Sequence, residues 1–175
     1  AGLTTLRNLA RLDLSCHAMG AEGLWRLAAA LQPLPVTDLD LRSNRLDIVA
    51  VGPLSSLLAD HSALRRLQLG FVACDGGLGD RNQLDAECVE KLTRPLGDLK
   101  CLTSLDLSGC EFGAAGAEHV ARSLDGKCDL TELHLGSNIL GSKGAVAVAG
   151  ALGQLDKITW LNLGSNDLGA EGAAA

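Results

Sequence analysis

One stretch recurs along the chain with a nearly constant period, and this recurrence limits the folds that the chain can adopt. Residues 133–145 read LHLGSNILGSKGA, and two close copies, LDLSGCEFGAAGA and LNLGSNDLGAEGA, begin 28 residues before and 28 residues after them. A fixed period of this length is typical of a solenoid, in which each unit stacks on its neighbours and no unit folds alone. We therefore predict a single repeat domain over residues 1–175.

The repeat divides the chain into six units. They begin near residues 9, 36, 64, 102, 130 and 158, after a stretch 1–8 that has the pattern of a truncated helix end. The third unit is ten residues longer than the usual 28, and the alignment of Asn82 with Asn138 places these residues in an insert within 70–81. Because both ends of the chain fall inside repeats, we expect it to be a piece of a longer protein.

Each unit has the pattern of a short strand, a turn and a helix. Alternate leucines in Leu-x-Leu point to one side of a strand, towards a core, while the residues between them point to the other side. An asparagine follows the strand at positions 44, 82, 138 and 166, and its side-chain amide can satisfy backbone groups of the turn. Such bonds would form a ladder across the stacked units. Cys110 takes this place in the fourth unit and His17 in the first. Glycine pairs such as Gly141 and Gly144 suit a tight turn into a helix.

The pattern Leu-x-x-Leu-x-Leu-x-x-Asn/Cys-x-Leu, followed by Gly-x-x-Gly-Ala and a helix, resembles the leucine-rich repeat in its ribonuclease-inhibitor-like class of about 28 residues. The resemblance covers nearly the whole chain. It implies an α/β solenoid, a curved horseshoe arc with parallel strands on the concave face and helices on the convex face. The departures are the insert, the Val51-Gly-Pro sequence in the second unit, and Asp47 and Asp85, which stand where glycine is usual.

Composition and charge exclude several classes of function. A net charge of −6 argues against nucleic acid as the main partner, because phosphate binding needs lysine and arginine gathered on one face. No apolar run is long enough to span a membrane, and no signal peptide is visible, so we expect an intracellular, cytoplasmic protein with no membrane partner. The absence of an Asn-x-Ser/Thr sequon agrees with that compartment.

The six cysteines have no spacing typical of zinc sites, so we predict neither a metal nor any other cofactor. We expect them to be free thiols rather than disulfides. They are Cys16, Cys74, Cys88, Cys101, Cys110 and Cys128.

Outward strand positions form two columns on the concave face, one residue per unit. The first column runs Arg11, Asp38, Arg66, Ser104, Glu132, Trp160, and the second runs Asp13, Asp40, Gln68, Asp106, His134, Asn162. A merely solvated sheet face would also be polar. Two features favour binding: Asp13 and Asp40 are close enough to repel each other mildly, and Trp160 has no structural reason to be exposed there. Trp25, in contrast, is expected to pack at the flank of its helix.

The insert is glycine-rich and lies at the strand-to-helix end of the third unit, where loops often carry function. Its apolar residues, Phe71 and Leu78, either contact a partner or fold back on the solenoid. The candidate protein-binding residues are therefore Arg11, Asp13, Asp38, Asp40, Arg42, Arg66, Gln68, Phe71, Leu78, Asp106, Glu132, His134, Trp160 and Asn162.

No nucleotide-binding or hydrolase motif is present, so no catalytic residue is predicted and the chain is expected not to be an enzyme. We predict a protein–protein interaction scaffold, and a subunit of a larger assembly is one arrangement compatible with this role. Two alternatives follow from the resemblance: a Ran-type GTPase-activating protein, and the ligand-sensing repeat region of a nucleotide-binding immune receptor. Measuring phosphate release from a small GTPase would distinguish the first alternative from the scaffold.

Overall fold

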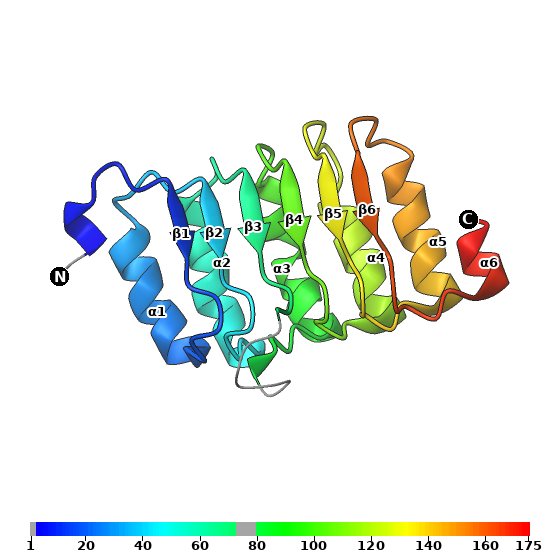
Figure 1. Ribbon diagram of the computed structural model, residues 1–175, viewed down its shortest axis with the longest axis horizontal. Helices are drawn as coiled ribbons and strands as arrows, with labels where there is room; N and C mark the ends of the chain where they lie inside the picture. The colour runs from blue at the N-terminus through cyan, green and yellow to red at the C-terminus, as the bar shows by residue number, and fades with distance from the viewer. Residues whose placement is uncertain (1–2, 73–79) are drawn as a thin grey trace.

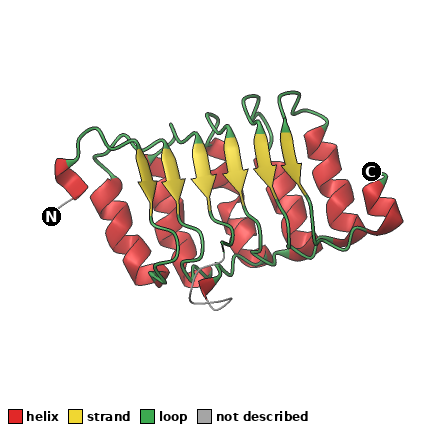
Figure 2. Ribbon diagram, in the orientation of Figure 1, coloured by secondary structure: helices red, strands yellow, loops and turns green. Residues whose placement is uncertain are grey.

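The computed structural model describes residues 3–72 and 80–175, and within them it shows one sheet of six parallel strands in sequential order (Figures 1 and 2). Each strand has three residues and comes from one repeat unit. The strands are β1 (Arg11–Asp13), β2 (Asp38–Asp40), β3 (Arg66–Gln68), β4 (Ser104–Asp106), β5 (Glu132–His134) and β6 (Trp160–Asn162). Parallel neighbours require a crossover connection, which the intervening helix supplies.

The helices of the described residues lie on one side of this sheet, and the two chain ends lie at opposite ends of the molecule (Figure 2). The α-helices are α1 (Gly20–Leu31), α2 (Val51–Asp60), α3 (Ala86–Asp98), α4 (Gly113–Ser123), α5 (Gly141–Leu152) and α6 (Gly169–Ala173). Two short 3-10 helices, η1 (Leu3–Thr5) and η2 (Ile48–Ala50), precede β1 and α2. The predicted solenoid of alternating strands and helices is confirmed.

The core lies between the sheet and the helices and is built from the repeated leucines. The middle leucines of the four inner strands, Leu39, Leu67, Leu105 and Leu133, are buried, and Val120 and Val148 pack above them from α4 and α5. The equivalent Leu161 in β6 is 39% exposed because no described strand covers its outer side. Burial is therefore greatest in the middle of the stack.

The predicted asparagine ladder is confirmed. The amide oxygen of Asn138 accepts the backbone N–H of Cys110 (2.9 Å) from the preceding unit, and its nitrogen donates to the carbonyls of Leu107 (2.8 Å) and Leu135 (2.9 Å). Asn82 makes the equivalent contacts across the insert, since its amide accepts the N–H of Asn44 at 2.9 Å. The insert therefore leaves the asparagine ladder between the second and third units intact.

The cysteines agree with the expectation of free thiols only in part. Cys88, Cys101, Cys110 and Cys128 are free, but Cys16 is disulfide-bonded, so the expectation is wrong for that residue. Spacing along the chain cannot reveal which thiols meet in space, and this is why the sequence does not show the bond. In the part of the chain that the structure describes, no helix is long and apolar enough to cross a membrane.

Candidate functional site

The strand register aligns the outward side chains on the exposed sheet face, by which we mean the side of the sheet away from the helices. Each strand pairs with the next without a slip, so that the middle leucines face one another throughout. The two predicted columns therefore exist as straight rows. In register they are Arg11, Asp38, Arg66, Ser104, Glu132, Trp160 and Asp13, Asp40, Gln68, Asp106, His134, Asn162.

On β1–β3 the charged side chains of the first row pair with one another. Asp38 lies between two arginines, at 3.7 Å from Nε of Arg11 and 3.9 Å from Nε of Arg66. Both guanidinium groups remain well exposed, and a partly solvated pair of this length contributes little to stability. The row nevertheless presents one aspartate between two arginines on this half of the face.

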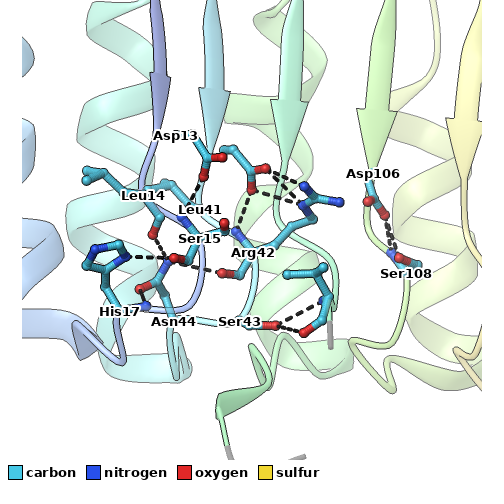
Figure 3. A network of polar contacts seen from close by, with 12 residues as sticks. Asp13, Leu14, Ser15, His17, Leu41, Arg42, Ser43, Asn44, Asp106 and Ser108 are labelled. Carbon is cyan, nitrogen blue, oxygen red and sulfur yellow. Dashed lines mark hydrogen bonds and ion pairs between the residues drawn. The ribbon is translucent and has the colours of Figure 1, made fainter. Parts of the chain in front are cut away.

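The second row on β1–β3 is organised by Arg42, which follows β2 (Figure 3). Its Nη2 donates to Oδ2 of Asp40 at 2.6 Å and its Nε donates to both carboxylate oxygens, and this bonding raises the pKa of Arg42. Asp40 is only 7% exposed. Asp13 accepts the backbone N–H of Ser15 at 2.9 Å, which, with the nearby Arg42, lowers the pKa of Asp13. The repulsion expected between Asp13 and Asp40 is thus offset by the arginine.

These residues of both rows surround a shallow hollow of about 400 Å³ on the exposed sheet face. Its lining alternates acidic and basic groups from β1, β2 and β3. The lining residues are Arg11, Leu12, Asp13, Asp38, Leu39, Asp40, Arg42, Arg66 and Gln68.

β4 contributes less to the exposed sheet face than the sequence suggests. Ser104 is buried, being a short side chain in register with the longer Arg66 and Glu132. Asp106 is 7% exposed, and its Oδ1 accepts both the backbone N–H (2.8 Å) and the hydroxyl (2.6 Å) of Ser108. Figure 3 shows this pair beyond the Arg42 network. The carboxylate of Asp106 therefore stabilises the turn that follows its strand.

β5 and β6 present a different surface. Trp160 is 59% exposed, and its ring centroid lies 6.4 Å from that of His134, with 36° between the planes. Glu132 is in register with Trp160 and is half-buried. Within residues 3–72 and 80–175, neither Glu132 nor His134 forms an ion pair or a side-chain hydrogen bond. Asn162 accepts the N–H of Gly164 at 3.0 Å.

The described residues at the two ends of the insert, 70–72 and 80–81, lie at the strand-to-helix edge. The guanidinium carbon of Arg81 lies 4.7 Å from the centroid of the Phe71 ring, and Nη1 of Arg81 donates to Glu111 at 2.9 Å. The Phe71 side chain also lies against Gly109. Phe71 and Arg81 line a hollow of about 330 Å³ that reaches Asn162. Phe71 thus folds back on the solenoid, while Leu78 lies outside the described residues.

A surface that the sequence does not predict lies on the helix side. Trp25 is 65% exposed rather than packed at the flank of α1, and it borders a groove of about 460 Å³ between α1 and α2. Small residues, Ala28 and Gly52 among them, line the groove. Their small size is the signal in the sequence that could have revealed it. Among the described residues, no group of three or more His, Cys, Asp or Glu side chains could hold a metal ion.

Comparison with known families gives one match. A family model described as "Leucine Rich repeat" matches residues 5–28, 98–121, 126–149 and 157–175, which together are slightly more than half of the chain. No curated protein matches the chain. The region between the first two matched segments holds the insert and the two aspartates that replace glycine, Asp47 and Asp85.

Proposed function

We propose, since the chain belongs to the leucine-rich repeat family, that it is a non-enzymatic scaffold that binds a partner protein through the exposed sheet face, the strand-to-helix edge and the insert. Repeats of this family generally mediate protein–protein interaction, and extended solenoid faces are well suited to it. We also infer that the repeats are of the ribonuclease-inhibitor-like class, because four of the five steps between units are 27 or 28 residues. The repeat domain would occupy residues 1–175.

The observation that carries this proposal is the exposure of Trp160 in a row of otherwise polar or charged side chains. A tryptophan that is more than half exposed buries only part of its ring on folding, and tryptophan is among the residues that most often dominate the free energy of protein interfaces. The neighbouring rows add polar groups at a regular spacing, which suits a polar rim around such an anchor.

A disulfide at Cys16 is unusual in a reducing compartment, and it weakens the intracellular expectation that rests on free thiols.

The proposal is tested by affinity capture from a cell extract with two immobilised variants. In Arg66→Ala/Phe71→Ala/Trp160→Ala, the exposed sheet face loses an arginine and a tryptophan, and the strand-to-helix edge loses a phenylalanine. We expect this variant to lose the main partner that the wild type retains, because truncation of a hot-spot residue such as Trp160 costs about 2 kcal/mol or more.

The matched control is Trp25→Ala/Arg94→Ala/Val146→Ala, which removes exposed side chains of similar kind from the helix side. It should keep the partner. Circular dichroism establishes that both variants are folded. Retention of every partner by the first variant would overturn the proposal, and loss of the partner only by the control would move the binding surface to the helices.

A further inference from the structure

The exposed sheet face consists of two halves that differ in how their charges are used. On β1–β3, each of the carboxylates of Asp38 and Asp40 has an arginine partner within 4 Å. On β5 and β6, Glu132 has no cationic partner among the described residues, although its carboxylate lies on the same open surface. The second half thus carries one carboxylate, that of Glu132, whose charge is not compensated within the described chain.

The uncompensated carboxylate lies beside the exposed indole. Glu132 and Trp160 occupy directly paired positions of neighbouring strands, where side chains on one face are close enough to contact the same group. His134 lies two residues further along β5, and its ring centroid is 6.4 Å from that of the indole. Asp106, in register with His134, adds a second negative charge on the adjacent strand.

This deepens the proposed function and rests on it: we propose that Glu132 and Trp160 bind a basic side chain of the partner protein, an arginine or a lysine. Its cation would lie over the face of the indole and pair with the carboxylate. The π face of tryptophan attracts a cation more strongly than any other aromatic side chain does. The net charge of −6 also favours the approach of a basic partner.

Two other kinds of partner residue fit this surface less well. An apolar side chain seated on Trp160 would remove water from Glu132 and leave its charge without a partner, which is costly. An acidic side chain would be repelled by both Glu132 and Asp106. Only a basic side chain satisfies the aromatic ring and the carboxylate together.

The two tryptophans of the chain make a direct test possible, because each gives one indole N–H signal in a ¹⁵N-correlation NMR spectrum. The probe is an acetylated, amidated pentapeptide of glycine and serine with one central arginine. The Trp160 signal, assigned by its loss in Trp160→Phe, should shift and saturate as the peptide is added. The Trp25 signal, from a similarly exposed indole on the helix side, should not shift.

Three controls decide the outcome. The same peptide with citrulline, which is neutral and of nearly the same shape as arginine, should cause no saturable shift. Glu132→Gln should weaken binding of the arginine peptide about threefold or more, as expected for loss of a partly exposed ion pair. Glu118→Gln, on α4, should leave it unchanged. Equal shifts with citrulline or leucine at the centre, no shift of the Trp160 signal, or no effect of Glu132→Gln would each overturn the assignment.

This experiment fails separately from the test of the scaffold. If the arginine peptide does not bind but the triple variant still loses a protein partner, the binding face stands and the basic side chain is wrong. If the peptide binds and the triple variant loses no partner, the cation site stands and the proposed scaffold function is wrong.

Discussion

At the scale of single residues, two buried polar side chains satisfy the ends of neighbouring helices. Lys127 and His61 each stand three residues before the start of a unit. Lys127 Nζ donates to the carbonyls of Leu96 (2.6 Å) and Leu99 (2.9 Å) at the end of α3, and the His61 ring lies 3.2 Å from the carbonyl of Leu31 at the end of α1. The last carbonyls of a helix lack partners within it, so these contacts join adjacent repeats.

Burial lowers the pKa of Lys127 from 10.5 to about 8, and this predicts a pH dependence of stability. Below about pH 8 the amine is charged in the native and unfolded states, and the native state bears the full cost of burying that charge. Between about 8 and 10.5 only the unfolded state binds the proton, so the free energy of unfolding rises with pH. Between pH 8 and 10.5, the free energy of unfolding of the wild type should therefore rise by about 3 kcal/mol relative to that of Lys127→Met.

The measurement is urea unfolding of both proteins at several pH values, from which the difference in free energy of unfolding is plotted against pH. The comparison with Lys127→Met is needed because burial raises the pKa of Cys110, and that of Cys88 to about 12, against an ordinary value of 9.0. Both proteins therefore lose stability as the pH rises above 9, when only the unfolded thiols ionise. A difference that is flat, or that falls, between pH 8 and 10.5 would contradict the prediction.

The sequence predicts some of these residues and not others, for a physical reason. Asn138 and its equivalents are predictable because the backbone groups of the turn need a hydrogen-bond partner in every unit. Lys127 and His61 are not, since the equivalent positions hold Pro33, Leu99 and Leu155, and no periodic signal remains. The pairing of Asp38 with Arg11 and Arg66 also escapes prediction: the period gives the row but not the direction in which each long side chain extends.

At the scale of elements, the turn from strand to helix has two solutions in this chain. In the fourth, fifth and sixth units a glycine with positive φ begins the helix, as at Gly113 (65°) and Gly141 (59°). In the second and third units aspartate stands there, and its side chain caps the helix instead: Asp47 accepts the N–H of Val49 and Asp85 accepts that of Cys88. The aspartates that replace glycine at positions 47 and 85 therefore begin their helices in a different way.

The two inner glycines of α5 should respond oppositely to alanine. A Cβ at Gly144 would lie 3.0 Å from Cβ of Leu140 and 3.2 Å from Cβ of Ala117, so Gly144→Ala should push α4 and α5 apart and cost about 1–3 kcal/mol. Nothing lies within 4 Å of a Cβ at Gly150, where alanine should stabilise the helix by about 0.5–1 kcal/mol. Thermal and urea unfolding measure both effects. Equal effects of the two substitutions would mean that helix spacing does not limit packing here.

At the scale of the whole molecule, the stack has a regular backbone and an uneven surface. The six in-register strands, visible together in Figure 1, follow from the repeat and were predictable in full. The division of the exposed sheet face was not, because Asp40 and Asp106 occupy equivalent positions yet one is bound by Arg42 and the other by Ser108. The residue two positions after each aspartate, in the turn, thus decides whether that aspartate remains available to a partner.

Because each unit contacts only its neighbours, a break in the ladder should have a directional effect on the stack. Asn138 joins the fourth unit to the fifth, and Asn138→Ala would leave the N–H of Cys110 and the carbonyl of Leu107 buried without this partner. We expect the free energy of unfolding to fall by about 3 kcal/mol, from the cost of unsatisfied buried polar groups.

Hydrogen exchange followed by mass spectrometry should show the largest loss of protection in β5, α5 and β6 and little change in α1 and β2. The exposed Asn8→Ala serves as the control. A uniform loss of protection from β1 to β6 would instead show that the stack unfolds as one cooperative body, in which neighbouring units are coupled more strongly than the ladder alone can explain.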